Sequence, residues 1–254
     1  MEECGLSTTE TMIKGIYRNA SSMIHRIKEQ ESIANNIANA STPGYKKDSV
    51  FVNELSHAQQ RSFPRKSDWQ TPMIDQVYTD FSQGSFDRTG AELDVAIDGD
   101  GFFVVKTEQG VEALIRGGAL TRDQQGFLKT ADNDAVQSDG GPIQLPIGDV
   151  SIADDGAISV NGNVVGRLRV ATIENLNDLQ RLGDGKFLVP ENVELTSAVR
   201  FVVRQGYLES SNVNVVTQMV DMIASYRNYE ADANSLKTQD QSLAKLISEV
   251  GRAI

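Results

Sequence analysis

The chain has little of what most enzymes and disulfide-bonded proteins depend on. Its 254 residues include one cysteine, Cys4, so no disulfide framework can form within it. Its two histidines, His25 and His57, adjoin neither a cysteine nor a carboxylate pair in a catalytic arrangement. Nucleophile-elbow and phosphate-loop motifs are also missing. These absences favour a protein that is not an enzyme and uses no cofactor, although carboxylates from distant strands could still meet in a cleft.

Long apolar runs, basic clusters and a cleavable leader are missing as well. No window approaches 18 consecutive apolar residues, so we expect no membrane-spanning helix. The formal net charge is −11, and no basic cluster would follow a phosphate backbone, which argues against nucleic acid as a partner. The acidic start of the chain lacks the cationic and hydrophobic parts of a signal peptide. The protein therefore looks cytosolic, unless it is exported without a cleaved signal.

A metal site is not predicted either. Asp94, Asp98 and Asp100 lie close together in the sequence and suggest calcium at first sight. An EF-hand loop starting at Asp94 would place Ala96 and Val105 at ligand positions, and neither has a side-chain oxygen.

What the chain does have is a long amphipathic stretch at each end. Apolar residues recur at steps of three and four after a capping-box sequence at residues 7–10. The same spacing returns over residues 213–250, which contain no Gly or Pro. A long core helix is one interpretation of the C-terminal stretch. Because neither helix can hide its apolar face alone, we favour two helices that pair with each other and are covered further by other copies.

Three asparagines and a turn interrupt the first helical pattern near its end. Asn35, Asn36 and Asn39 are unfavourable inside a helix, because their amides compete with the backbone for hydrogen bonds. They mark either a fraying last turn or amides that bind a neighbouring segment of fixed geometry. The next residues, 42–45, read Thr-Pro-Gly-Tyr, which suits a type II turn and ends the helix.

Residues 85–205 are predicted to form an antiparallel β-rich body. Short apolar strands alternate there with Asp-Gly and Asn-Gly turns, for example at residues 155–156 and 161–162. The fold class predicted is α+β: long N- and C-terminal helices pairing as a coiled-coil-like stem, with a central antiparallel, partly barrel-like domain. The predicted parts are an N-terminal extension (1–11), a helical stem (12–42 and 206–254), a polar connector (43–84) and the β-rich body (85–205).

Three blocks of the sequence resemble the family of bacterial flagellar rod and hook proteins. The first is NNIANASTPGYK at residues 35–46, and the second is LDVAIDGDGFFVV at residues 93–105. The third is QGYLESSNVNVV at residues 205–216, followed by further matches at 219–223 and 227–230. Three blocks in the same order over nearly the whole chain make the resemblance specific. It begins near residue 12 and leaves the first eleven residues unexplained.

The resemblance implies a structural axial subunit of the flagellar basal-body rod. Such subunits self-assemble into a helical tube around an export channel and transmit torque from the motor to the hook. The resemblance also implies rod and hook proteins as partners, a place in the periplasmic rod, and export by the flagellar type III apparatus without a cleaved signal. The short connector favours a proximal rod subunit over a distal one, and the small body argues against a hook subunit. The alternative from another class is a non-flagellar β-domain adaptor or binding module, which would stay monomeric.

The residues expected at subunit interfaces are stripe positions of the two helices, asparagines near the helix ends, and the turn between helix and connector. They are Ile16, Met23, Ile27, Asn35, Asn36, Ile37, Asn39, Pro43, Gly44, Tyr45, Asn212, Asn214, Val216, Met219, Ile223, Tyr226 and Leu243. The asparagines are expected to act as polar locks where helices meet the body.

Overall fold

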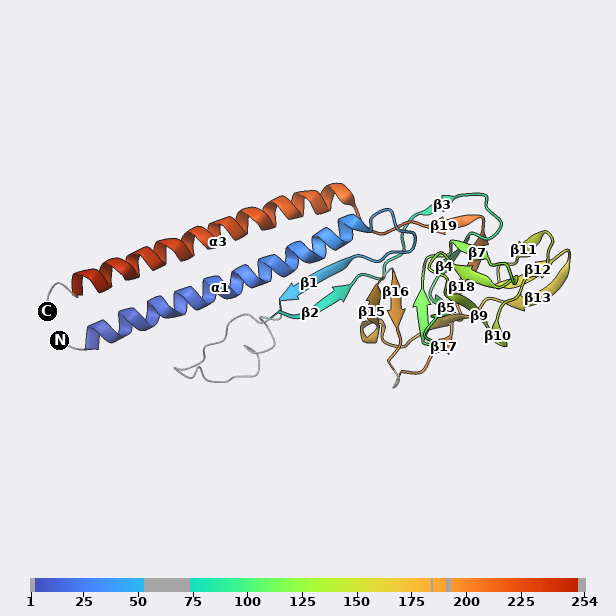
Figure 1. Ribbon diagram of the computed structural model, residues 1–254, viewed down its shortest axis with the longest axis horizontal. Helices are drawn as coiled ribbons and strands as arrows, with labels where there is room; N and C mark the ends of the chain where they lie inside the picture. The colour runs from blue at the N-terminus through green and yellow to red at the C-terminus, as the bar shows by residue number, and fades with distance from the viewer. Residues whose placement is uncertain (1–2, 53–73, 184, 191–192, 251–254) are drawn as a thin grey trace. The chain divides into compact units, whose positions relative to one another are not determined.

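The computed structural model describes residues 3–52, 74–183, 185–190 and 193–250, which form two compact units (Figure 1). The first unit contains the described parts of Met1–Ile37, Asp48–Tyr78 and Asn214–Ile254. The second contains the described parts of Ala38–Lys47 and Thr79–Val213.

The first unit consists of two long helices and a hairpin. Helix α1 (Glu3–Ala38) and helix α3 (Val215–Val250) have 36 residues each, which corresponds to about 54 Å per helix. They lie side by side, and the sheet of β1 (Asp48–Val52) and β2 (Ile74–Thr79) lies along α1 (Figure 1). Helix α3 has an asparagine N-cap, since Thr217 N–H donates to Asn214 Oδ1 at 3.1 Å.

The second unit is built from short strands and one 3₁₀ turn, η1 (Leu176–Asp178). The strands are β3 (Phe86–Arg88), β4 (Val95–Gly99), β5 (Phe102–Lys106), β6 (Glu112–Ile115), β7 (Leu120–Arg122), β8 (Leu128–Thr130), β9 (Ala135–Ser138), β10 (Gly141–Pro142), β11 (Val150–Ile152), β12 (Ala157–Val160), β13 (Asn163–Arg167), β14 (Val170–Thr172), β15 (Gln180–Gly183), β16 (Lys186–Leu188), β17 (Thr196–Ser197), β18 (Phe201–Gln205) and β19 (Tyr207–Glu209).

Ten of these strands form one sheet, in the order β15-β16-β6-β5-β9-β8-β7. Strand β10 adds to β9, and β14 pairs with both β5 and β17. The remaining strands form a β11-β12-β13 meander and the pairs β18-β4 and β19-β3. Every pairing described within the second unit is antiparallel.

Strand β5 carries the core of this unit on both of its faces. Phe103 and Val105 join the larger apolar cluster, while Phe102 and Val104 join a smaller one. All four side chains are buried, as expected where alternate residues point to opposite faces of a covered sheet. In the smaller cluster, the Phe187 ring lies 5.9 Å from that of Phe102 in an edge-to-face contact.

The α+β class agrees with the structure, but the partly barrel-like body does not. A barrel requires the first and last strands of the sheet to pair. Within the described residues, β15 pairs only with β16 and β7 pairs only with β8, so the sheet is open. The sheet also branches at β5 and β9, and its strands are at most five residues long.

The prediction of a coiled-coil-like stem is also wrong. A coiled coil buries an apolar seam between its helices. The described side-chain contacts between α1 and α3 are instead hydrogen bonds between polar groups, while Val216, Met219, Val220, Ile223 and Tyr226 of α3 are more than half exposed.

Candidate functional site

A buried carboxylate lies between two cations in the second unit. Lys46 Nζ is 2.6 Å from Glu209 Oε1, and Arg116 Nε is 2.6 Å from Glu209 Oε2. The three side chains are at most 6% exposed, and Gly84 N–H also donates to Glu209 Oε1 at 3.0 Å. A buried charge is tolerated when it is paired and hydrogen-bonded in this way.

Arg116 extends this ionic cluster to the second sequence block. Its guanidinium donates to the backbone carbonyl of Gly99 at 2.6 Å, to that of Ile97 at 3.2 Å, and to that of Gly101. Lys46 closes the first block and Glu209 belongs to the third. The three blocks that carry the family resemblance therefore meet at one buried cluster, joined by an arginine that lies in none of them.

Burial lowers the pKa of Lys46 below its ordinary value, and this outweighs the opposing effect of the hydrogen bond and charge of Glu209. Lys46 Nζ also donates to the carbonyl of Ser82 at 2.7 Å. The ammonium is thus bound on two sides yet held away from water.

The turn over residues 42–45 packs tightly beside this cluster. Tyr45 N–H donates to Thr42 O at 3.2 Å, and Gly44 has φ +70, so the predicted type II turn is confirmed. A Cβ atom at Gly44 would lie 2.1 Å from Gly117 N, so only glycine fits there. Tyr45 is buried, with the guanidinium of Arg181 4.6 Å from its ring centroid.

Asn212 binds the backbone of two neighbouring segments within the second unit. Its Oδ1 accepts from Lys47 N–H at 2.7 Å, and its Nδ2 donates to the carbonyls of Asp80 at 2.8 Å and Ser82 at 3.1 Å. An asparagine amide supplies both the donor and the acceptor that this arrangement needs.

Asn36 plays a similar part in the first unit. Its Oδ1 accepts from Asp48 N–H at 2.9 Å, and its Nδ2 donates to Asp48 O at 2.7 Å. The same Nδ2 donates to Gln218 Oε1 of α3 at 2.9 Å. Asn36 and Gln218 are 1% and 2% exposed, so these bonds are shielded from water. The side chain therefore holds strand β1 and helix α3 against the end of α1.

The bond from Asn36 to Gln218 is the first of four polar contacts that we call the polar ladder. Ser225 Oγ donates to Glu29 Oε2 at 2.9 Å, and Ser22 Oγ donates to Asp232 Oδ2 at 2.7 Å. A fourth rung is farther along, where Asn19 Nδ2 donates to Ser235 Oγ at 3.0 Å. The rungs of the polar ladder are Asn36–Gln218, Glu29–Ser225, Ser22–Asp232 and Asn19–Ser235. The first three are seven residues apart on both helices, about two helical turns.

Part of the apolar surface of α3 lies on the side away from this ladder. Five side chains there are 51–72% exposed and form what we call the outer ridge: Val216, Met219, Val220, Ile223 and Tyr226. At about 100° per residue, the ridge is about 80–200° around the helix from Gln218. On α1, Ile24 and Ile27 are 56% and 42% exposed and lie about 140–200° from Ser22. The polar ladder thus lies between the helices and these exposed apolar side chains lie on their outer sides, while Met222, Tyr229, Leu236 and Leu243 are half-buried on the ladder side of α3.

The other residues proposed for interfaces are in varied environments. Met23, Ile37, Asn39 and Leu243 are half-buried, whereas Asn35, Pro43 and Asn214 are exposed. The side chain of Ile16 lies outside the described residues. None of these placements tests a contact with another subunit.

Sequence reasoning missed Arg116, Glu209 and Gln218. Arg116 and Glu209 are a charged pair separated by 93 residues, and no local pattern links them. Gln218 did have a signal, because polar residues recur every seven positions at 218, 225 and 232 and again at 22, 29 and 36. The spacing of apolar residues alone does not reveal this polar repeat.

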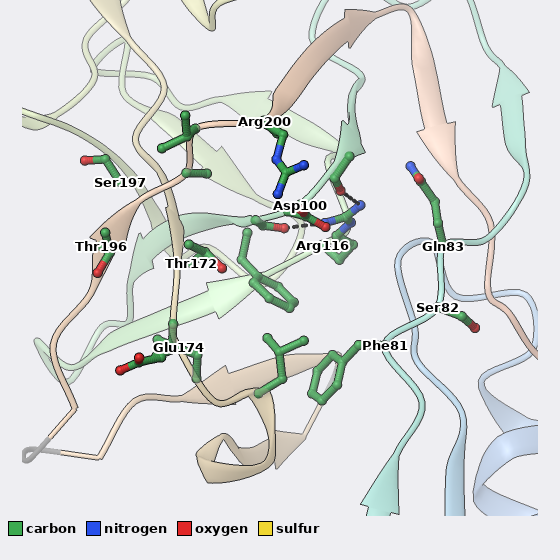
Figure 2. Close-up of a pocket in the computed structure, with 17 residues that line it drawn as sticks. Phe81, Ser82, Gln83, Asp100, Arg116, Thr172, Glu174, Thr196, Ser197 and Arg200 are labelled. Carbon is green, nitrogen blue, oxygen red and sulfur yellow. Dashed lines mark hydrogen bonds between the residues drawn. The ribbon is translucent and has the colours of Figure 1, made fainter.

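A pocket of about 550 Å³ lies in the second unit, between residues 99–102 and 196–200 (Figure 2). Phe81 and Phe102 supply apolar lining, and Arg200 and Asp100 lie on the opposite side from Phe81 in this view. Arg116 also lines the pocket, and its hydrogen bonds to the backbone carbonyls of Gly101 and Gly99 are drawn as dashed lines. The lining contains neither histidine nor cysteine.

The part of the chain that the structure describes contains no cluster of three or more His, Cys, Asp or Glu side chains placed to hold a metal ion. It also contains no helix with the length and hydropathy needed to cross a bilayer.

Three family models match segments along the chain. "Flagella basal body rod protein" matches residues 16–46, "Flagellar hook protein FlgE/F/G D1 domain" matches residues 96–160, and "Flagellar basal body rod FlgEFG protein C-terminal" matches residues 204–249. Together they include residues of the ionic cluster, the polar ladder and the outer ridge.

Whole-length relatives agree with these matches. Flagellar basal-body rod protein FlgF of Salmonella typhimurium is 32% identical over 251 residues, which are 91% of this chain and 96% of the relative. FlgF of Caulobacter vibrioides is 29% identical over 95% of this chain and 99% of the relative. Flagellar basal-body rod protein FlgG of Buchnera aphidicola subsp. Acyrthosiphon pisum is 33% identical over 84% of this chain and 91% of the relative.

Proposed function

Because the chain belongs to the flagellar basal-body rod protein family, as a structural subunit of the rod, we propose that it self-assembles there into a helical tube that transmits torque from motor to hook. We further propose that its role is mechanical and not catalytic. The observation that carries the proposal is the outer ridge, a row of apolar side chains that the single chain leaves more than half exposed. An exposed apolar row of this kind needs other chains to cover it.

The outer ridge is the proposed interface. Val216, Met219, Ile223 and Tyr226 were expected at interfaces, and their exposure in the single chain supports that role. Fully burying one such side chain is worth about 1.5–3 kcal/mol, so a ridge of five supplies a substantial driving force when a neighbouring copy covers it. A contact between different surfaces of successive copies does not close on itself and generates a helical assembly.

The remaining parts of the proposal follow from family membership. We propose other rod and hook proteins as partners, a place in the periplasmic part of the basal body, and export by the flagellar type III apparatus without a cleaved signal. We also propose the proximal rod as its position, on the basis of the short segment 43–84. Imaging of a basal body with this subunit tagged distinguishes a proximal position from a distal one.

The test of the interface is a charge placed on the ridge. Ile223→Asp should leave the second unit folded, because Ile223 is 56% exposed and belongs to the other unit. It should remove the chain from purified basal bodies and abolish motility, because the carboxylate would have to be buried on assembly. Ala224→Asp is the matched control, since Ala224 is exposed, adjacent in sequence and off the ridge. Normal incorporation of the Ile223→Asp variant would overturn the proposed interface.

A further inference from the structure

The polar ladder joins α1 and α3 in one antiparallel register, with successive rungs advancing by the same number of residues on each helix. We infer that its members are positioning residues, which select the register and rotation that keep the outer ridge pointing away from α1. This inference rests on the proposed function, because it explains how the assembly surface is kept open in the single chain.

Hydrogen bonds suit this task better than apolar contacts do. The hydrophobic effect is non-directional, so two helices with apolar stripes can rotate and bury them against each other. That rotation would hide Met219 and Ile223 before another copy could bind them. Hydrogen bonds weaken steeply when donor and acceptor are misaligned, so the ladder favours one rotation and one register. Three of its members, Asn36, Gln218 and Ser225, are at most 3% exposed, where an unmade bond is most costly.

The placement of charge on the ladder adds a penalty for slipping. Each acidic member faces an uncharged partner: Glu29 faces Ser225, and Asp232 faces Ser22. Sliding the helices by one rung in one direction would bring Glu29 opposite Asp232, and two carboxylates would then face each other. Sliding in the other direction would bring Ser22 opposite Ser225 and leave Asp232 without its serine. The native register is the one that pairs both acids with hydroxyl donors.

An exchange of partners tests this in the full chain. Ser22→Asp places two carboxylates on one rung and should lower the amount of the chain in purified basal bodies by about tenfold. Asp232→Ser alone leaves a serine pair and should have a smaller effect in the same direction. The double variant Ser22→Asp with Asp232→Ser restores a carboxylate opposite a hydroxyl and should restore incorporation. Recovery in the double variant separates a role in pairing from a general need for either residue.

Disulfide trapping reports the register itself, in the unassembled chain with Cys4→Ser. The pair Ser22→Cys with Asp232→Cys should form an internal disulfide under mild oxidation, because the two side chains face each other. The matched pair Ser22→Cys with Ser225→Cys is one rung out of register and should not. A third change, Ser225→Glu, places a second carboxylate opposite Glu29. It should reduce disulfide formation by the pair Ser22→Cys with Asp232→Cys, because the two carboxylates repel each other.

The outcomes separate this inference from the assignment on which it rests. Equal trapping of the two cysteine pairs, or equal incorporation of Ser22→Asp and the double variant, would overturn the ladder as a register device. In those cases the unaltered chain would still be found in basal bodies, and the proposed function would stand. Absence of the unaltered chain from basal bodies would overturn both.

Discussion

The two units of this protein differ in how much of their large apolar side chains they bury. In the second unit, alternate residues of β5 are buried on both faces of the sheet, and the charged groups inside are paired. In the first unit, the helices are joined by polar contacts and carry Ile24, Ile27 and the outer ridge exposed on their outer sides. The second unit therefore contains its own core, whereas the first leaves a row of apolar side chains exposed.

The chain's stability and its capacity for assembly therefore reside in different units. Removing an apolar side chain from a packed core costs stability in the free chain, whereas removing one from an exposed face does not. In a subunit that functions only in an assembly, the exposed face contributes its free energy when a second copy arrives. Experiments that measure each unit separately test this difference, and hydrogen exchange of peptides specific to each unit is suited to them.

The largest effect is expected from Glu209→Leu. This change would leave Lys46 and Arg116 as two adjacent buried cations without a counter-charge. The free energy of unfolding of the second unit should fall by about 3–5 kcal/mol, measured by urea denaturation and by hydrogen exchange. The control is Asp98→Asn, which breaks the ion pair with Arg204 at the surface and should cost less than about 1 kcal/mol. If the two changes lowered the free energy of unfolding by similar amounts, Glu209 would not stabilise the second unit through its buried ion pairs.

The sharpest test makes one chemical change in both units. Ile97→Ala removes a fully buried side chain of the second unit and should cost about 2–5 kcal/mol of stability. Ile223→Ala removes a side chain that is 56% exposed in the first unit and should change the stability of the free chain by less than about 0.5 kcal/mol. The order should reverse for assembly, where Ile223→Ala weakens incorporation. A large loss of stability in free Ile223→Ala would show that the ridge is already covered within the single chain.

A smaller effect is expected from Asn36→Leu. It would leave the backbone of Asp48 and the side chain of Gln218 without their buried partner. Faster hydrogen exchange should follow at β1 and at the adjoining end of α1, equivalent to about 1–3 kcal/mol. Glu31→Leu, at an exposed position of the same helix, is the control. If exchange at β1 were unchanged, the hydrogen bonds of Asn36 would contribute nothing to holding β1 and β2 in place.

Much of the fold could be predicted from the sequence because its signals are local. Helical spacing, the turn at residues 42–45 and the Asp-Gly and Asn-Gly hairpins each depend on neighbours within a few residues. The α+β class and the exposure of Ile223 and Tyr226 agree with that reasoning. The same reasoning assumed that apolar stripes face each other within one chain, and this produced the incorrect coiled-coil-like stem.

The parts that could not be predicted depend on distant residues. Nothing near Arg116 indicates that it binds Glu209, since 93 residues separate them. Whether the sheet closes depends on the pairing of β7 and β15, which hairpin signals do not determine. The polar ladder was readable in part, because its seven-residue repeat is present on both helices, but only the structure shows that the two repeats face each other.

The smallest effect concerns Lys46 and pH. Its pKa in the folded chain is below the ordinary 10.5, because burial disfavours the ammonium more than Glu209 favours it. Between the folded and unfolded pKa values the unfolded chain binds more protons, so the stability contributed at this site should rise with pH up to about 10.5.

The measurement is the urea midpoint of the second unit at several alkaline pH values, for the unaltered chain and for Lys46→Met. Subtracting the variant removes the titration of other lysines and tyrosines. The difference should shift in favour of the unaltered chain as pH rises, whereas a shift in the other direction would mean that the ion pair with Glu209 dominates and that this buried lysine is held as a cation throughout.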